Sequence, residues 1–342
     1  MATIADVANE AGVSISTVSY ALSGKRSISP STRDKVEAAA TKLGYRPHAS
    51  ARMLAANRSH IIAVTAPLHA DTDHSAHMQF AMEVTQSARE HDYDTLLLVH
   101  NDALEGMQRS AATSLADGII VLDVDAHDDR AALARTLKCP IVFIGIPEDT
   151  DGLVCVDLDF EAAAELAIDR LIDAGRTNIG LISHHQETLE RESNFPLRFL
   201  HGFRKHATEN GVDSAIAYPT EHRAHEAVAA LLAELPDLDG LVLNTSADVA
   251  ASVTAALAEH GKSVPVDVSV IAAGVTFSTH RFPLALDTIP LDAHASCSVA
   301  VDMLVEMVED GLKPPATTLI APTYINFGSV TSSTASVIPQ VN

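Results

Sequence analysis

The stretch TIADVANEAGVSISTVSYAL, residues 3–22, determines how the N-terminal part of the chain folds. Thr3 can cap a first helix, and Asp6, three residues later, has the spacing of a capping-box carboxylate. Gly12 predicts the end of this helix, and Ser14 can cap a second short helix. Two short helices around a glycine-containing turn are typical of a helix-turn-helix.

The second helix is expected to turn hydroxyl groups and one aromatic ring outward. Helical spacing places Val18, Ala21 and Leu22 on its inward face. The residues expected on the outward face are Ile15, Ser16, Ser19 and Tyr20. Small hydroxyls and an aromatic ring suit contacts with DNA phosphates and with a groove. A bare helix-turn-helix pattern is frequent by chance, so the residues that follow must support it.

A third helix and a short connecting segment follow. Ser31 or Thr32 can cap this helix, and Gly44 predicts its C-terminal end. Residues 45–55 then form a helix-prone segment that contains Pro47 and is too short to pack a core of its own.

With these residues the chain resembles the lac repressor (LacI/GalR) family of bacterial transcription regulators. The resemblance is carried by residues 3–22, by SPSTRDKVEAAATKLGYRPHASARML at residues 29–54, and by later segments in the same order over nearly the full length. It implies an α/β protein with an N-terminal helix-turn-helix headpiece plus hinge helix. A two-lobed periplasmic-binding-protein-like core with parallel sheets would follow.

The resemblance also implies which residues of the headpiece contact palindromic operator DNA. Ile15, Ser16 and Tyr20 would read base edges in the major groove. The other expected DNA contacts, mostly with phosphates, are Thr3, Ser14, Thr17, Ser19, Ser29 and Thr32. Most family members carry arginine where Tyr20 stands, so the preferred half-site is expected to differ.

In the family, two hinge helices of a homodimer pair over the centre of the operator and push a leucine between base pairs. Here Leu54 occupies that place, and Ala51 is small enough to allow close approach. Inserting an apolar wedge costs unstacking energy, which is offset only when both hinges are ordered. Residues 47–55 are therefore expected to form a helix whose folding depends on both DNA binding and effector binding, rather than a plain linker.

The charge is divided unevenly along the chain. The net charge is −22, yet residues 1–60 carry eight Lys and Arg against four Asp and Glu. Phosphate neutralisation dominates DNA affinity, so only this basic part should approach a duplex. The acidic remainder should be held away from the duplex and limit non-specific binding.

From Ser59 onward the pattern changes to alternating strands and helices. A first lobe is expected to hold buried strands at residues 61–66, 95–99, 118–122 and 141–144. The pattern restarts after Asp159, with helices expected at 160–171, 195–210 and 248–260 and strands at 179–182, 241–243 and 268–272. Such alternation predicts two α/β lobes with parallel sheets.

The expected domain boundaries follow from these changes of pattern. They are 1–46 for the headpiece, 47–58 for the hinge helix or linker, 59–330 for the effector-binding and dimerisation core, and 331–342 for a flexible tail. Within the core, the N-lobe would comprise about 59–158 and 292–320, and the C-lobe about 159–290 and 322–330. The tail lacks the leucine heptads that a tetramerising family member needs.

The cleft between the lobes is the expected effector site, because open parallel sheets bind ligands beyond the carboxyl ends of their strands. The family's Asn-Pro-Phe-Phe stretch corresponds here to His74-Ser75-Ala76-His77. Family carboxylates correspond to Gly145, Ala247 and Gly274-Val275, which disfavours a hexose bound in the usual way. The remaining candidates are His74, His77, Asp159, Phe160, Arg191, Arg198 and Asp248. Arg198 stands one residue off the family's RxxGF spacing.

No metal, cofactor or catalytic site is expected. The histidine pairs at 74 and 77 and at 184 and 185 lack an obvious third ligand for zinc. Cys139, Cys155 and Cys297 have no CxxC spacing and are expected to be buried thiols. No glycine-rich phosphate loop or nucleophile elbow is present, so an enzyme is not expected.

The sequence therefore predicts a transcriptional regulator, which is expected to act as a repressor. A sugar, polyol or nucleoside would control its operator affinity, and the protein would be a cytoplasmic homodimer without a membrane span or signal peptide. Two alternatives remain: a solute-binding protein, or a sugar- or nucleoside-processing α/β protein with an appended DNA-binding module. Operator binding that a small molecule changes would separate the regulator from both.

Overall fold

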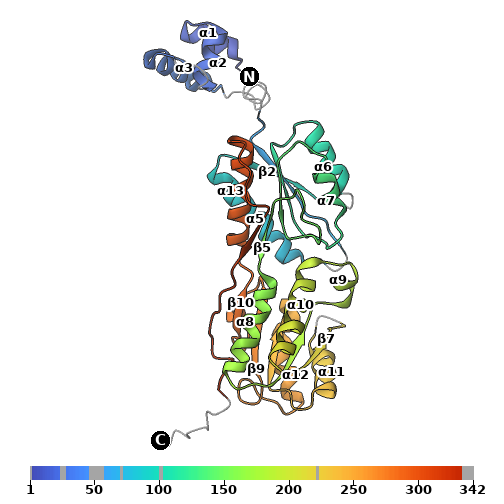
Figure 1. Cartoon of the computed structure of the whole chain (residues 1–342). Coiled ribbons are helices and arrows are strands. Elements are labelled where there is room, and N and C mark those ends of the chain that lie inside the picture. The colour runs from blue at the N-terminus through green and yellow to red at the C-terminus, as the bar shows by residue number, and fades with distance from the viewer. Residues whose placement is uncertain are drawn as a thin grey trace, which may run out of the picture.

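The computed structural model describes residues 2–23, 28–45, 58–69, 72–99, 103–220 and 223–332. Figure 1 shows a small helical headpiece at one end, followed by two α/β lobes stacked end to end. Within these described ranges, none of the helices combines the length and apolar character needed to cross a membrane.

The headpiece is a three-helix unit built from α1 (Ile4–Ala11), α2 (Ile15–Ser23) and α3 (Pro30–Leu43). The capping box of Thr3 and Asp6 is confirmed, and Gly12 ends α1 with a left-handed φ of 67°. The headpiece core consists of small apolar side chains, namely Val7, Ala8, Val18, Ala21, Val36, Ala39 and Ala40.

The predicted start of the third helix was wrong. Ser29, not Ser31 or Thr32, is the N-cap, and its Oγ accepts a hydrogen bond from the backbone N–H of Thr32 at 3.2 Å. The helix begins at Pro30, because proline has no N–H to lose and its fixed φ suits the first helical position. Gly44 ends α3 as predicted.

The N-lobe holds a six-stranded parallel sheet in the order β11-β5-β4-β3-β1-β2. Its elements are β1 (Ile61–Thr65), α5 (His74–Glu90), β2 (Asp94–Leu98), α6 (Ala103–Ala112), β3 (Gly118–Val121), α7 (Asp129–Ala134), β4 (Ile141–Ile144), β5 (Cys155–Leu158), α13 (Ala293–Glu309) and β11 (Thr317–Ile320).

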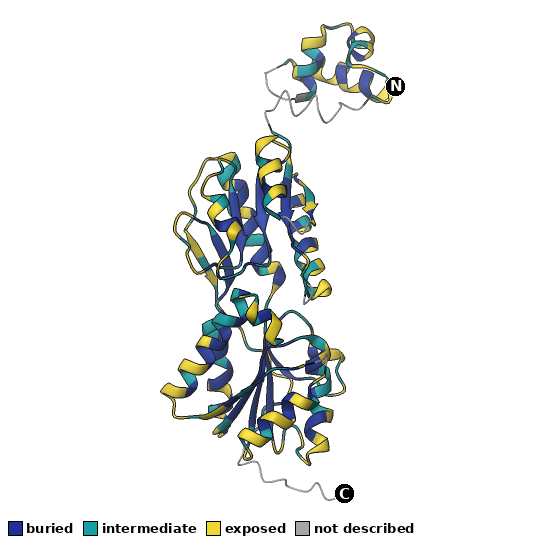
Figure 2. Ribbon diagram, turned by 90° about the vertical axis from the view of Figure 1, so that its right-hand side faces the viewer, coloured by how far each residue is buried: buried dark blue, intermediate teal, exposed yellow. Residues whose placement is uncertain are grey.

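The C-lobe holds a five-stranded parallel sheet in the order β10-β9-β8-β6-β7. Its elements are α8 (Phe160–Asp173), β6 (Asn178–Ile182), α9 (Gln186–Glu190), α10 (Asn194–Glu209), β7 (Asp213–Ala217), α11 (His225–Glu234), β8 (Gly240–Leu243), α12 (Ala247–Glu259), β9 (Ser269–Val275), the short 3-10 helix Thr279–Arg281 and β10 (Asp287–Pro290). Figure 2 shows buried strands inside each lobe and helices with exposed outer faces.

The predicted core strands and helices are present, with ends shifted by up to three residues. Sequence patterning missed the strands β5, β7, β10 and β11 and the helices α9 and α11. These four strands have only four or five residues each. The recognised strands β3, β4 and β8 are just as short but apolar throughout, whereas each missed strand contains polar or charged residues, and pairing with distant strands stabilises it.

The chain passes between the lobes three times. It leaves the N-lobe after β5, returns after β10 to form α13, and leaves again after β11, where Ile325 pairs with Thr288 of the C-lobe. Buried Asp287 fixes this last segment, because its Oδ1 accepts hydrogen bonds from the backbone N–H groups of residues 327, 328 and 329 at 2.7–2.9 Å. The polypeptide segment that follows β11 is therefore a strap across the C-lobe.

Candidate DNA-binding and effector sites

The outward face of α2 carries the exposed side chains that the sequence predicted. Ile15 is 52% exposed and Tyr20 is 36% exposed. At the start of the helix, Ser14 Oγ accepts a hydrogen bond from the backbone N–H of Thr17 at 3.1 Å. The same oxygen lies 2.8 Å from the Ser16 hydroxyl, so hydroxyl groups cluster at this helix N-terminus.

A similar cluster stands at the N-terminus of α3. The hydroxyls of Ser29 and Thr32 are 2.7 Å apart, and Ser31 Oγ lies 3.2 Å from Ser29 Oγ. Helix N-termini present N–H groups and a positive dipole end, which favour phosphate oxygens. The N-termini of both helices are therefore suited to bind phosphates of a DNA backbone. Ala51 and Leu54, the predicted minor-groove residues, lie outside the described residues.

A cavity of about 1570 Å³ lies between the two lobes. Of the seven predicted effector residues, His74, His77, Phe160, Arg191 and Asp248 line it. The residues come from both lobes, beyond the carboxyl ends of strands or at the starts of helices, which is where an α/β sheet places its ligand.

The structure places the other two predicted residues elsewhere. Arg198 Nη1 donates to Asp157 Oδ2 at 2.7 Å, and Asp159 Oδ1 accepts from the backbone N–H of Ala162 as the cap of α8. Both line a smaller pocket beside the first lobe crossing. Arg198 therefore offsets the charge of buried Asp157 rather than lining the large cavity.

The loop after β3 supplies a cavity residue that sequence reasoning missed. Asp123 lies two residues after the end of the strand, has a φ of 53°, and lines the cavity. Two imidazoles face it, since the Nε2 atoms of His69 and His77 each lie 3.7 Å from Asp123 Oδ2. A carboxylate shortly after a buried parallel strand was the available signal.

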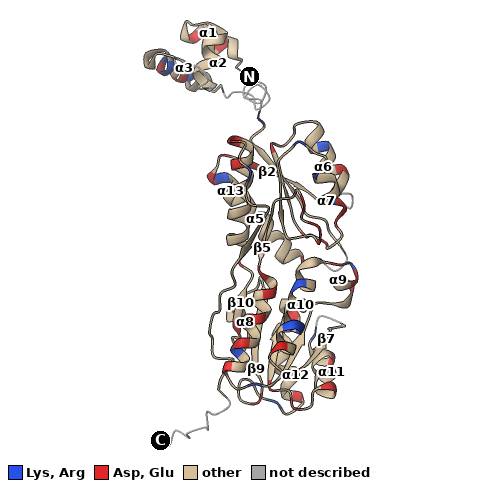
Figure 3. Cartoon of the chain, in the orientation of Figure 1, with Lys and Arg blue, Asp and Glu red and all other residues tan. Residues whose placement is uncertain are grey.

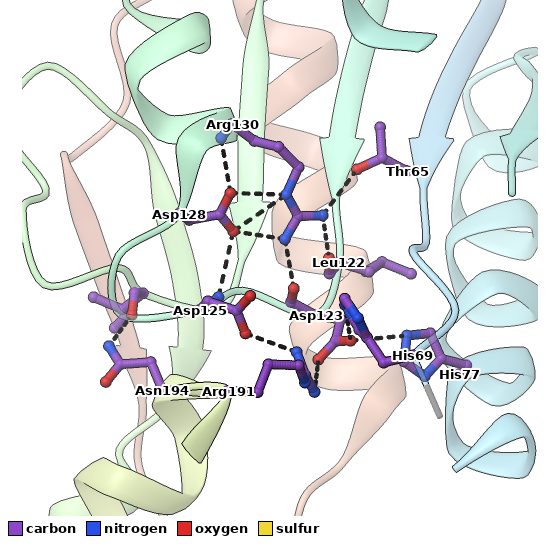
Figure 4. Close-up of polar contacts among 11 residues, drawn as sticks. Thr65, His69, His77, Leu122, Asp123, Asp125, Asp128, Arg130, Arg191 and Asn194 are labelled. Carbon is purple, nitrogen blue, oxygen red and sulfur yellow. Dashed lines mark hydrogen bonds and ion pairs between the residues drawn. The ribbon is translucent and has the colours of Figure 1, made fainter. Parts of the chain in front are cut away.

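Arg191 joins the two lobes across the cavity edge. Its Nη1 donates to Asp125 Oδ1 at 2.7 Å, and its Nη2 lies 3.4 Å from Asp123 Oδ1 (Figure 4). Backbone bonds continue the contact: Ala126 N–H donates to the Glu192 carbonyl at 2.7 Å. We call residues 123–126 and 191–194 the interlobe latch.

A buried arginine of the N-lobe, Arg130, holds residue 123 of the latch through hydrogen bonds. Arg130 is 5% exposed, and its guanidinium donates to the carbonyl oxygens of Leu122 at 2.8 Å and Asp123 at 2.5 Å. It also pairs with Asp128 at 2.6 Å. Charge-assisted bonds of this kind hold a loop in one geometry more firmly than neutral bonds do.

Aromatic rings and hydroxyls complete the cavity wall on the C-lobe side. The rings of Phe160 and Phe195 have centroids 5.5 Å apart, and His184 meets Phe195 edge-on at 4.9 Å. Among the described residues, no hydrogen-bond partner is found for the buried Thr245 Oγ1 and Ser246 Oγ. The wall therefore offers apolar faces beside hydroxyls that a polar ligand can satisfy.

Within the described part of the chain, no group of three His, Cys, Asp or Glu side chains is placed to hold a metal ion.

Asp125 is expected to make the core more resistant to unfolding as the pH falls from about 6 toward 4. Burial is the main cause that raises its pKa to about 6, while Arg191 opposes the rise. An unfolded aspartate titrates near 3.8. In this pH range the folded protein therefore binds a proton that the unfolded chain does not, and stability increases with acidity.

Urea unfolding at pH 7, 6 and 5 checks this expectation, with Asp125→Asn as the comparison. Asp157, whose burial also raises its pKa to about 6, is present in both proteins, so their difference isolates Asp125. Identical pH dependence in the two proteins would contradict the assignment.

Comparisons with known proteins agree over both parts of the chain. A model of the lacI family of bacterial regulatory proteins matches residues 3–48, and a model of a periplasmic binding protein-like domain matches residues 168–330. Catabolite control protein A of Priestia megaterium is 30% identical over 278 residues, covering 79% of this chain and 81% of its own. The transcriptional repressor PurR of Photobacterium profundum is 28% identical over 322 residues, covering 91% and 93%.

A crystal structure of the lac repressor dimer bound to operator and the anti-inducer ONPF has the same fold. It superposes with a TM-score of 0.80 over 96% of this chain and 99% of that chain, at 22% sequence identity.

Proposed function

Because the chain belongs to the lacI family of bacterial regulatory proteins and is a DNA-binding transcriptional regulator, we propose that it is a repressor whose operator affinity a small molecule controls. The observation that carries the proposal is the presence, in one chain, of a headpiece with two hydroxyl-lined helix N-termini and a two-lobed core with a large cavity. The DNA would bind the first and the effector the second. No catalytic role is assigned to any residue.

The charge distribution supports this division of labour. The headpiece with its connection is basic overall, whereas the core is strongly acidic. Figure 3 shows Asp and Glu residues, in red, on helices of the core, including α8. Repulsion between this core and a duplex would leave the headpiece as the only part that approaches DNA.

For operator binding we assign Ile15, Ser16 and Tyr20 to base edges and the hydroxyls at the two helix N-termini to phosphates. A single headpiece offers little surface for a long operator, so the active form would be a homodimer on a palindromic site. Residues 47–58 would connect headpiece and core, with Leu54 as the minor-groove wedge.

For the effector we propose a sugar, polyol or nucleoside. The cavity offers aromatic faces for a ring and unsatisfied hydroxyls for polar substituents, which suits all three classes. A thermal-shift screen of these compounds tests the assignment, because a ligand bound only by the folded cavity raises the melting temperature by mass action.

Selection of bound sequences from a random duplex library tests the function as a whole. The protein should enrich a palindrome, and a compound that raises the melting temperature should change the affinity for that palindrome. Failure to enrich any sequence would overturn the proposal.

Replacing Tyr20 by arginine should change which operator is preferred. Tyr20 is exposed on α2, and an arginine there can form two hydrogen bonds with a guanine edge. Such a contact discriminates between bases by about 1–3 kcal/mol. The same library selection should therefore return a palindrome that differs at one position per half-site. An unchanged palindrome would show that this residue does not read bases.

A further inference from the structure

The core end of the connection to the headpiece is held at two places. Asp117, which precedes β3, accepts hydrogen bonds from the backbone N–H groups of Ser59 at 2.7 Å and His60 at 2.8 Å. Arg58, which precedes Ser59, contacts a different part of the core, the C-terminal turn of α13. The point at which the chain enters the core is therefore fixed by two separate elements.

Arg58 makes three contacts with the end of α13. Its Nη2 donates to the carbonyl oxygens of Val308 at 3.1 Å and Glu309 at 3.3 Å. Its Nη1 lies 3.2 Å from Glu309 Oε1. Tyr93, fully buried, donates its hydroxyl to the same carboxylate oxygen at 3.4 Å. Glu309 is thus held from both sides.

The end of α13 needs a cation that the helix does not supply. Every residue of α13 is described, and its last turn contains acidic residues and no basic one. The C-terminus of a helix carries a partial negative charge and unsatisfied carbonyl groups, which a guanidinium satisfies well. Arg58 provides this cation from a segment about 250 positions away in sequence.

The other end of α13 lies at the effector cavity. Leu291 lines the cavity and donates its backbone N–H to the carbonyl of Val275 in the C-lobe at 2.8 Å. Asp292 caps α13 with its carboxylate directly after that crossing. With 17 residues, α13 extends for roughly 26 Å at 1.5 Å per residue. It packs against α5, β3, β4 and β5 along the way.

We propose that Arg58 is a positioning residue for operator binding, which attaches the headpiece connection to a helix whose far end senses the cavity. A displacement of the C-lobe moves Leu291, α13 transmits the movement as a rigid element, and Arg58 passes it to the connection. This inference rests on the proposed function, since it concerns how core and operator binding are coupled.

The test uses the full-length protein and the palindromic duplex that the wild type selects from a random library. Arg58→Ala should bind this duplex about tenfold more weakly, the loss expected for one charge-assisted hydrogen-bond group. Arg58→Lys keeps the charge, but its single amino group cannot contact both carbonyls and the carboxylate. Its affinity for the selected duplex should therefore be severalfold lower than that of the wild type. Binding to a scrambled duplex should stay within about twofold in both variants, because the phosphate contacts of the headpiece are unchanged.

Arg135→Ala is the matched control. Arg135 also donates to two backbone carbonyls, of Asp149 and Asp151, and pairs with Asp149, and its side chain is 30% exposed against 33% for Arg58. It belongs to the N-lobe, and these contacts join it to the loop between β4 and β5 rather than to the connection. This variant should show the same thermal stability as Arg58→Ala and wild-type affinity for the selected duplex.

Three results would overturn the inference. The first is unchanged affinity of Arg58→Ala, and the second is wild-type affinity of Arg58→Lys, which would leave only a charge effect. The third concerns the slope of log affinity against log salt concentration. If Arg58→Ala released about one counterion fewer than the wild type, Arg58 would itself bind a phosphate. If the wild type selects no duplex at all, the proposed function fails instead, so the two failures are distinguishable.

Discussion

Replacing Arg130 by alanine is expected to lower the free energy of unfolding of the core by about 3–5 kcal/mol, the usual cost of removing one partner from a buried ion pair. The variant leaves the Asp128 carboxylate, whose side chain is only 4% exposed, without its cation. It also leaves the carbonyls of Leu122 and Asp123 without their donor. Urea unfolding followed by circular dichroism measures the loss.

Arg89→Ala is the control for Arg130→Ala. Arg89 forms an ion pair with Asp94 at 2.9 Å, but both side chains are largely exposed. Its removal should lower the free energy of unfolding by less than about 1 kcal/mol, because water stabilises two exposed charges nearly as well as the ion pair does. Equal losses in the two variants would show that Arg130 adds nothing beyond a surface ion pair.

Replacing Ala39 by aspartate should weaken operator binding by about a hundredfold or more and leave the core intact. Ala39 is 5% exposed inside the headpiece core, which consists of small side chains. A buried carboxylate costs several kcal/mol, and a domain of this size has little stability to lose. A folded fraction of about 1% or less lowers the apparent affinity for the selected duplex by about a hundredfold or more. Fluorescence anisotropy measures the binding, and calorimetry should show an unchanged melting transition of the core.

The neighbouring residue provides the control for this prediction. Ala38 lies on the same helix but is exposed, so Ala38→Asp adds the same charge without burying it. It should weaken binding only slightly, through repulsion of the phosphates. Equal losses in the two variants would mean that charge, rather than headpiece folding, governs the effect.

Local features were predictable from the sequence because they depend on residues close together. The capping box of Thr3 and Asp6 involves two side chains three positions apart, and its geometry follows directly from the pattern. Short strands such as β7, which reads DSAIA, depend instead on pairing with a distant strand. No local pattern reports such a partner, so the lobes were predictable as a type, whereas the edge strands β7, β10 and β11 were not.

The cavity was predictable by its position but only partly by its residues. Asp123 follows a buried strand and could have been named from that fact alone. Arg198 illustrates the opposite case, because its role depends on Asp157, which lies 41 positions away and meets it at 2.7 Å only after the lobes are formed. Ionic partners across such distances follow from packing, which the sequence does not display.

The strap over the C-lobe has a consequence for synthesis on the ribosome. The headpiece requires only the first 45 residues, so it can fold while the remaining chain is still being made. The N-lobe sheet waits for β11 at residues 317–320, and the C-lobe waits for the strap residues that bind Asp287. Neither lobe can close its structure until nearly the whole chain has emerged, which exposes apolar strands for most of translation. A premature stop after Asp310 would therefore remove an edge strand from one lobe and the strap from the other, and leave a DNA-binding headpiece attached to two incomplete lobes.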